Sequence, residues 1–171
     1  MESKKRMKEK AILFIYGEGG HRAKMQRLFN YIDEELEPES DVKYISIYEN
    51  GDILDSINDG YEMPIVRDKY SKVRTIINIF IKPYEIISTL LKIKREYDVR
   101  MILSTGPGIS ILPTVFFKLF DNTKVIHFET DSRFMTKSLS GQILYRLVDK
   151  FYVPNKSLLK LYKKSEFSGQ L

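Results

Sequence analysis

The sequence predicts an α/β fold in which a parallel sheet is covered by helices on both faces. Short apolar runs typical of strands alternate along the chain with longer segments of helical spacing. Strands joined by crossover helices pair in parallel, and the helices then lie on the two faces of the sheet. The length of 171 residues suits a single domain, 1–171, with a basic tail at 1–10.

The expected strands are the short runs rich in β-branched and aromatic residues. In chain order they are 11–16, 42–48, 63–66, 99–104, 124–129 and 150–153. The expected helices are the segments in which apolar residues recur every three or four positions, at about 20–36, 72–97, 109–120, 140–148 and 155–164. Pro83 is expected to kink or divide the second of these helices.

Composition limits the classes of function. The chain has no cysteine and two histidines, which excludes thiolate metal sites and argues against any dedicated metal centre, so no metal or other cofactor is expected. A formal net charge of +5 indicates an anionic partner, such as a phosphate group or an acidic membrane face. RNA-binding signatures are missing, so no nucleic-acid partner is expected. No run approaches the roughly 20 apolar residues of a membrane span. We therefore expect a cytoplasmic protein, peripheral on a membrane.

The first candidate loop follows the first strand and precedes the first helix. It contains three glycines and a histidine, namely Gly17, Gly19, Gly20 and His21. Glycines allow a ligand to approach the backbone closely, and a helix N-terminus favours negative charge. The loop lacks the third glycine of the dinucleotide fingerprint. His21 is the best candidate for a general base because imidazole titrates near neutrality. The alternative is a helix-start histidine that only bonds a nearby carbonyl.

A second glycine-containing loop joins the strand at 99–104 to the next helix. Its candidate ligand-binding residues are Ser104, Thr105, Gly106 and Gly108, through hydroxyl groups and backbone amides. A tight turn without any ligand is the commoner use of Gly-Pro-Gly. Two such loops at the carboxyl edge of one sheet are more specific, and they favour a ligand that contains phosphate.

The third candidate loop follows the strand at 124–129. Alternation along that strand places His127 and Glu129 on one face. Glu129 is positioned to accept a hydrogen bond from a sugar hydroxyl or to orient a neighbouring base, and Arg133 is a candidate for binding phosphate. The alternative is a strand end in water with a surface pair between Asp131 and Arg133.

The helix expected at 72–97 is apolar around much of its circumference and basic near both ends. It is either a core helix with solvated ends or a surface that lies on an anionic membrane. The residues assigned to membrane contact are Lys72, Arg74, Ile76, Ile77, Phe80 and Lys82.

The three loops together resemble the acceptor-side half of GT-B glycosyltransferases. The likeness is to the asparagine-linked glycosylation family, member fourteen, and its bacterial exopolysaccharide relatives of the PssD kind, over nearly the whole chain. Gly17-Glu18-Gly19-Gly20-His21 is similar to the family's GxGGH loop, and Ser104 to Gly108 is similar to its S-x-G-P-G turn. The most specific block begins at Glu129 and continues through Ser138-Leu139-Ser140-Gly141 to Tyr145, Asp149 and Val153.

The resemblance implies a single Rossmann-like domain, equivalent to the N-terminal half of GT-B, within a two-chain glycosyltransferase. It implies that this chain binds the acceptor and recruits the enzyme to the cytosolic face of an anionic membrane. A donor-binding subunit would hold a UDP-sugar, of GlcNAc or another hexose, and the acceptor would be a polyprenyl-diphosphate-linked glycan. His21 and Glu129 would be the catalytic residues. The family's partner-docking segment corresponds to about 158–171, with Leu158, Leu161, Phe167 and Leu171 as contacts.

Two other classes of function remain open on the sequence. One is a non-catalytic scaffold that recruits a catalytic partner to the membrane. The other is a stand-alone nucleotide-binding domain. Loss of turnover with retained assembly, after substitution of His21 or Glu129, would argue against the scaffold. Nucleotide binding by the isolated chain would favour the nucleotide-binding domain.

Overall fold

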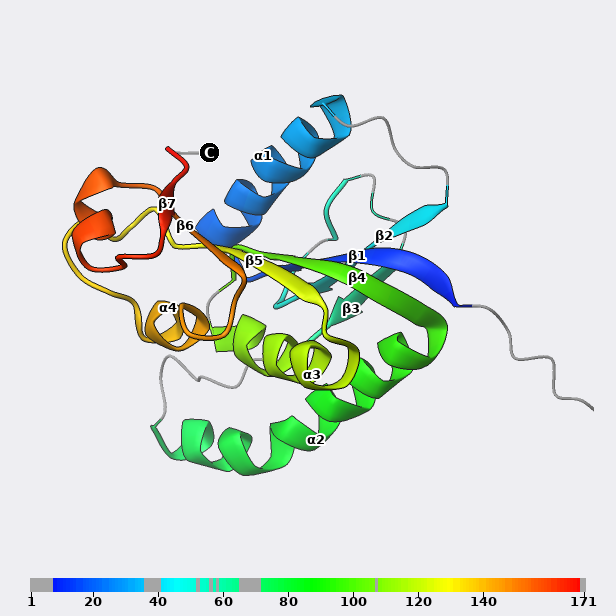
Figure 1. Cartoon of the computed structure of the whole chain (residues 1–171). Helices are drawn as coiled ribbons and strands as arrows, with labels where there is room; N and C mark the ends of the chain where they lie inside the picture. The colour runs from blue at the N-terminus through cyan, green and yellow to red at the C-terminus, as the bar shows by residue number, and fades with distance from the viewer. Residues whose placement is uncertain are drawn as a thin grey trace, which may run out of the picture.

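The fold was obtained as a computed structural model, which describes residues 8–35, 41–51, 53–55, 57, 59–64, 72–106 and 108–169. Side chains are described for all of these except residue 35 and residues 72–83. Within these ranges the chain forms the parallel α/β fold that the sequence predicts (Figure 1). The strands are β1 (Glu9–Tyr16), β2 (Val42–Tyr48), β3 (Asp59–Glu62), β4 (Tyr97–Ser104), β5 (Lys124–Phe128), β6 (Lys150–Val153) and β7 (Glu166–Phe167).

The strand order in the sheet is β3-β2-β1-β4-β5-β6-β7, and every neighbouring pair is parallel. The order changes direction between β1 and β4, because β2 lies on one side of β1 and β4 on the other. In open parallel sheets, the crevice at the carboxyl ends of the strands beside such a switch point is where ligands bind. The loops that begin at Gly17 and Thr105 therefore meet at the position the topology favours.

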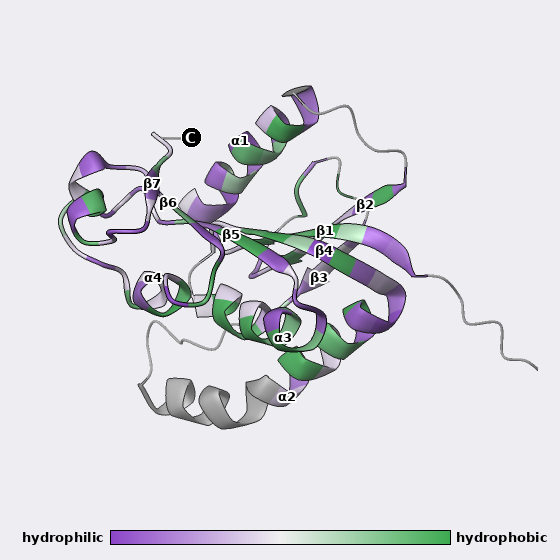
Figure 2. Ribbon diagram, viewed as in Figure 1, coloured by the Kyte–Doolittle hydropathy of each residue, from purple (hydrophilic) through white to green (hydrophobic). Residues whose placement is uncertain are grey.

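Helices cover the two faces of the sheet unequally. In Figure 1, α1 (Gly20–Glu35) lies above the sheet, and α2 (Lys72–Glu96) and α3 (Ile111–Asp121) lie below it. Alternate β1 side chains enter the two cores: Leu13 and Ile15 pack towards α2, and Phe14 and Tyr16 pack towards α1. Figure 2 shows the apolar residues of the strands between these layers. α2 is continuous through Pro83, so it is not divided there.

The third strand differs from the sequence-based prediction. The strand lies at Asp59–Glu62, whereas Met63 and Pro64 of the predicted 63–66 are not in a strand and residues 65–66 lie outside the described residues. Asp and Gly are depleted in strands, so the composition of residues 59–62 does not indicate a strand. Gly60 fits a close approach, since an added Cβ would come 2.5 Å from Ile53 Cδ1.

The C-terminal third also differs from prediction. α4 covers only Leu139–Leu144 of the expected 140–148, and the expected helix at 155–164 is the short 3₁₀ helix η2 (Lys156–Lys160). Leu158 and Tyr162 are both buried, and after them the chain turns to add β7 alongside β6. This edge strand was not predicted, because two residues have no detectable periodicity. A second 3₁₀ turn, η1 (Gly108–Ser110), precedes α3.

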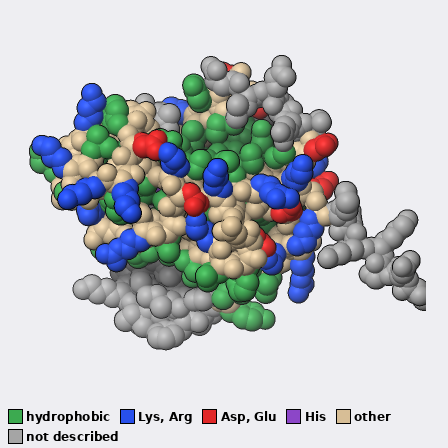
Figure 3. Space-filling view, in the orientation of Figure 1, with side chains coloured by type: hydrophobic (Ala, Val, Ile, Leu, Met, Phe, Trp, Pro, Cys, Tyr) green, Lys and Arg blue, Asp and Glu red, His purple; other side chains and the backbone are tan. Residues whose placement is uncertain are grey.

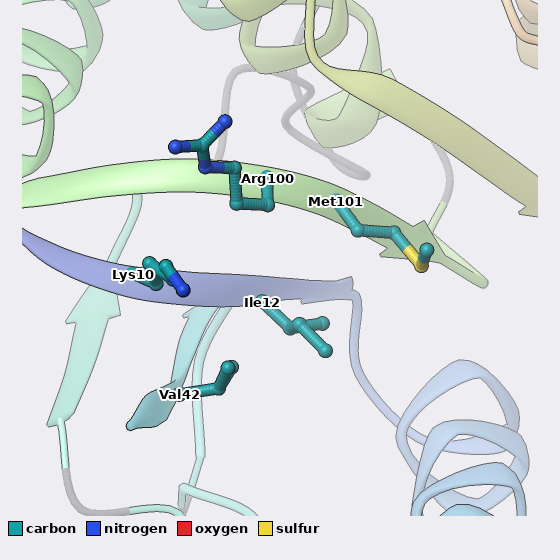
Figure 4. Close-up of a pocket in the computed structure, with 5 residues that line it drawn as sticks. All are labelled: Lys10, Ile12, Val42, Arg100 and Met101. Atoms are coloured by element: carbon teal, nitrogen blue, oxygen red, sulfur yellow. The ribbon is translucent and has the colours of Figure 1, made fainter. Parts of the chain in front are cut away.

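An open depression lies on the α1 face of the sheet, with a volume of about 450 Å³. Figure 4 shows its lining side chains on the amino-terminal halves of β1 and β2 and in the middle of β4, and they are Lys10, Ile12, Val42, Arg100 and Met101. The depression is therefore at the other end of the strands from the three candidate loops.

Candidate functional site

The first two loops are joined by a reciprocal pair of hydrogen bonds. Nδ1 of His21 lies 2.5 Å from the carbonyl oxygen of Thr105, and the Thr105 hydroxyl donates to the carbonyl oxygen of His21 at 2.9 Å. The backbone N–H of Thr105 also donates to the carbonyl of Ile15 on β1. The β1 and β4 loops are thus held in one fixed arrangement at the switch point.

The bond to Thr105 determines the tautomer of the neutral His21 ring. A carbonyl oxygen can only accept, so Nδ1 carries the proton, and Nε2 is the nitrogen with a free lone pair. His21 is half-buried at the start of α1. The arrangement can therefore present a proton acceptor at the carboxyl edge of the sheet, as a general base requires.

The glycines around His21 have different roles. Gly19 has a φ of +59°, a conformation that side-chain-bearing residues rarely adopt. At Gly20 and Gly108 an added Cβ would meet nothing within 4 Å, so the chain's own packing does not require glycine at either position. Open space over these two backbones agrees with the predicted ligand approach. Gly106 is different, because an added Cβ would lie 2.5 Å from Ser110 Oγ.

The hydroxyl groups of the second loop face inward. Ser104 is completely buried, and its Oγ lies 2.7 Å from Ser110 Oγ and 3.1 Å from Nδ1 of His127. The N–H of Gly106 donates to the same Oγ at 3.4 Å. Ser104 and Thr105 therefore hold the loop in shape, and their predicted contact with a ligand remains a prediction.

His127 lies behind this loop, and the sequence did not single it out as a site residue. It is buried on β5, and burial lowers its pKa to about 3, with a smaller lowering from electrostatic interaction with His21 and Lys24. The ring is therefore neutral at physiological pH. Its electrostatic interaction with His21 shows that the two histidines are close enough to influence each other.

Glu129 follows β5 and is buried among hydrogen-bond donors. Both of its carboxylate oxygens accept from the Ser138 hydroxyl, at 2.9 and 3.1 Å, and one also accepts from the Tyr162 hydroxyl at 2.8 Å. The N–H of Thr130 completes the set at 3.0 Å. Burial and the adjacent carboxylate raise the pKa of Tyr162. These contacts tie the end of β5 to the start of α4 and to the residues after η2, which makes Glu129 an organising residue.

Lys24 is a second buried charged residue, and the sequence analysis did not identify it. Its Nζ donates to the carbonyl oxygen of Glu129 at 3.0 Å and to the Asp131 carboxylate at 2.5 Å. It therefore connects α1, which begins beside His21, to the third loop. Arg27 lies 3.7 Å from the other Asp131 oxygen. The alternative interpretation, in which Asp131 pairs with Arg133, is thus replaced by pairing of Asp131 with α1.

The remaining predicted site residues lie at the surface, in the core or outside the residues that the structure describes. Arg133 is exposed, and its guanidinium donates to Thr136 Oγ1. The side chains of the six membrane-contact residues at 72–82 lie outside the described residues. Of the partner-docking residues, Leu158 is completely buried, Leu161 is half-buried, Phe167 is exposed, and Leu171 lies outside the described residues.

Among the described residues, no group of His, Asp and Glu is placed to hold a metal ion. No helix in the described parts of the chain combines the length and apolar character that a bilayer span requires.

An all-parallel sheet of order β3-β2-β1-β4-β5-β6-β7, with polar loops meeting at the β1/β4 switch point, defines a Rossmann-like domain. The residues from 12 to 171 match the family model described as oligosaccharide biosynthesis protein Alg14 like. The chain belongs to this Alg14-like family.

Curated relatives extend over nearly the whole chain. It is 28% identical to the UDP-N-acetylglucosamine transferase subunit alg14 of Schizosaccharomyces pombe, covering 98% of this chain and 86% of the relative. It is 29% identical to the subunit ALG14 of Candida albicans, covering 99% and 82%.

Solved structures with the same fold are larger. A UDP-N-acetylglucosamine 2-epimerase matches with a TM-score of 0.66 and 13% identity, covering 95% of this chain and 49% of the epimerase. The UDP-GlcNAc 2-epimerase of Neisseria meningitidis, bound to UDP-GlcNAc, matches with a TM-score of 0.59 and 16% identity, covering 94% and 46%. The chain therefore spans about half the length of these enzymes, and the likeness concerns the fold.

Proposed function

We propose that this chain is the acceptor-binding and membrane-recruiting subunit of a two-chain glycosyltransferase. The enzyme transfers a sugar, GlcNAc or another hexose, from a UDP-sugar to a polyprenyl-diphosphate-linked glycan. A separate donor-binding subunit holds the nucleotide sugar. Family membership supports the class of reaction, since the relatives above are named as UDP-N-acetylglucosamine transferase subunits.

The observation that carries the proposal is the position of His21. Its Nδ1–H is held by Thr105 at the switch point, which leaves Nε2 as the proton acceptor. In the reaction, Nε2 accepts the proton of the acceptor hydroxyl, the hydroxyl oxygen forms a bond to the anomeric carbon of the donor sugar, and the bond from that carbon to UDP breaks. Attack from the face opposite UDP inverts the anomeric centre. Thr105 fixes the ring in one orientation, which lowers the cost of ordering it.

The acceptor's diphosphate is assigned to the start of α1 and the second loop. The N-terminus of a 16-residue helix favours negative charge, and the backbones of Gly19 and Gly20 are exposed beside it. Gly108 leaves similar open space on the second loop. Arg133 is exposed on the third loop and adds a positive charge that can pair with phosphate.

Glu129 has a different role in this proposal from the one its motif suggests. Its carboxylate is buried and already accepts from Ser138, Tyr162 and Thr130. Its contribution is therefore to hold the third loop and α4 in place beside the site. Because Glu129 is buried, a direct hydrogen bond to the acceptor sugar would require the side chains that cover it to move.

The experiment is reconstitution of the two chains with a polyprenyl-diphosphate-linked glycan and a UDP-sugar, with transfer measured by product formation. Transfer that requires both chains supports the proposal. A His21→Ala complex that assembles and loses turnover supports the base assignment, whereas unchanged turnover would remove it. If substitutions of the site residues leave both turnover and assembly unchanged, the scaffold hypothesis is favoured. Micromolar nucleotide binding by this chain alone would favour a stand-alone nucleotide-binding domain.

The location follows from the substrates. A lipid-linked acceptor and a water-soluble UDP-sugar meet at the cytosolic face of a membrane, so we assign the complex to that face as a peripheral assembly. The net charge of +5 favours an anionic surface. The C-terminal segment, with Phe167 exposed on the edge strand β7, is assigned to the donor-binding subunit.

A further inference from the structure

Four large apolar side chains are exposed within ten residues of the chain, between the third loop and β6. The exposed fractions are 56% for Phe134, 83% for Met135, 82% for Leu139 and 47% for Ile143. We call residues 134–143 the apolar segment. A contiguous patch of exposed apolar side chains marks an interaction surface, whereas a single exposed one needs no explanation.

The helix within this segment is apolar on two sides. Gly141 and Leu144 are buried on its inner side. Leu139 and Ile143 are four residues apart, so they share a face of α4, and both point outward. Among the described residues, packing accounts for the inner pair, whereas the outer pair stays exposed.

The backbone of the apolar segment is held by hydrogen bonds on both sides of its exposed residues. The Ser138 hydroxyl donates to the Glu129 carboxylate and accepts from the N–H of Gly141. The side chains of Asn155 and Ser157, around the start of η2, donate to the carbonyl oxygens of Arg133 and Phe134. The exposed apolar side chains are thus presented from an ordered backbone, beside the loop that contains Glu129.

The charged residues within the stretch around the apolar segment are basic, and Asp131 and Asp149 lie just outside its two ends. The residues from 132 to 148 contain Arg133, Lys137 and Arg146 and no Asp or Glu. Figure 3 shows Lys and Arg groups gathered on the left-hand side of the molecule, over α4 and η2. Apolar side chains fringed by Lys and Arg are typical of elements that lie in an anionic membrane interface.

We propose that the apolar segment inserts Phe134, Met135, Leu139 and Ile143 into the headgroup region of an anionic bilayer. This inference rests on the proposed function for the presence of a membrane, and it assigns the contact to a part of the chain other than 72–82. Through Ser138 and Glu129 the inserted segment is coupled to the end of β5. The diphosphate of a lipid-linked acceptor, which lies among the headgroups, would then be level with the candidate site at the carboxyl edge of the sheet.

The chain has no tryptophan, so one introduced residue reports on its own surroundings. Phe134→Trp places the probe in the apolar segment, and Tyr31→Trp is the matched control on α1, across the sheet. With vesicles of phosphatidylcholine and phosphatidylglycerol, we expect a blue shift of the Phe134→Trp emission and no shift of the control. Met135→Ser with Leu139→Ser should weaken co-sedimentation by roughly tenfold or more.

Three outcomes would overturn the inference. In the first, Phe134→Trp emission is unchanged while the protein binds vesicles, which places the contact elsewhere. In the second, the protein does not bind the vesicles. In the third, the purified donor-binding subunit shifts the emission without lipid, which makes the segment a protein interface. Sugar transfer by the two-chain complex is measured separately. A responsive probe in a complex without transfer would sink the proposed function alone, and transfer with a silent probe would sink this inference alone.

Discussion

Nδ1 of His21 lies 2.5 Å from the carbonyl oxygen of Thr105, a residue 84 positions further along the chain, and the Thr105 hydroxyl donates back to the carbonyl of His21. The first bond leaves Nε2 as the proton acceptor, and the second joins the β1 and β4 loops. The pair therefore combines the chemistry expected of the site with the means of holding it in place.

The first prediction concerns this histidine. His21→Ala should lower the rate of sugar transfer by the reconstituted complex by roughly 10²- to 10⁴-fold, the usual contribution of a general base. Binding of the donor subunit should be unchanged, because the imidazole is not part of the assigned partner surface. Asn30→Ala, an exposed change on the same helix, is the control and should retain activity. Equal rates for the two variants would refute the role of His21.

The second prediction concerns the glycine that faces Glu129. A Cβ at position 141 would lie 2.0 Å from Glu129 Oε2 and 2.7 Å from the Tyr162 hydroxyl oxygen. Gly141→Ala should therefore lower the free energy of unfolding by about 1–3 kcal/mol, as overpacking does. Gly108→Ala, where an added Cβ meets nothing within 4 Å, should change it little. Urea denaturation measures both, and similar midpoints would show that the Glu129 cluster yields without cost.

The third prediction concerns pH. Burial lowers the pKa of His127 to about 3, whereas an unfolded histidine titrates near 6.5. Between these values the unfolded state binds a proton that the folded state does not, so stability falls as the pH falls from about 6.5. The loss is ~1.4 kcal/mol per pH unit, or about 2 kcal/mol by pH 5.

His127→Asn removes the titrating group and keeps a polar side chain. Its free energy of unfolding should therefore change less than that of the unsubstituted protein between pH 7.5 and pH 5, by about 2 kcal/mol. Both proteins retain His21, so the difference isolates position 127. Parallel stability curves for the two proteins would contradict a buried neutral His127.

The fourth prediction concerns the ion pair between α1 and the third loop. Asp131→Asn leaves the buried Lys24 ammonium without its carboxylate and should cost about 1–3 kcal/mol of stability. Arg27→Gln removes the outer, exposed partner of the same carboxylate at 3.7 Å and should cost far less. Thermal unfolding of both variants compares them. A larger effect at Arg27 would mean that the Lys24 contact contributes little.

The fifth prediction concerns assembly. Phe167→Ala should weaken binding of the donor subunit by about fivefold or more, as truncation of an interface aromatic does. Phe167 is exposed on a two-residue edge strand, so the fold should tolerate the change. Tyr31→Ala on α1 is the control, and binding is measured by titration of the partner. Unchanged affinity for Phe167→Ala would move the interface away from β7.

Long periodic elements were predictable from the sequence. The strand at 42–48 has the predicted bounds, and the helices at 20–36 and 72–97 agree to within one residue where the structure describes them. The meeting of the first two loops also followed, because parallel strands bring their carboxyl ends to one edge. β3 and β7 did not follow: one has a composition unlike a strand, and the other is too short to show a period.

The roles of individual polar side chains depended on contacts that only the folded chain makes. The sequence by itself determined the parallel α/β architecture, the edge of the sheet where the candidate loops meet and His21 as a base candidate, because these depend on local periodicity and chain order. The tertiary structure decided that Glu129 is enclosed by Ser138 and Tyr162, and that Lys24 bonds a carbonyl 105 positions away. Such partners are distant in sequence, and burial alone makes their pairing obligatory.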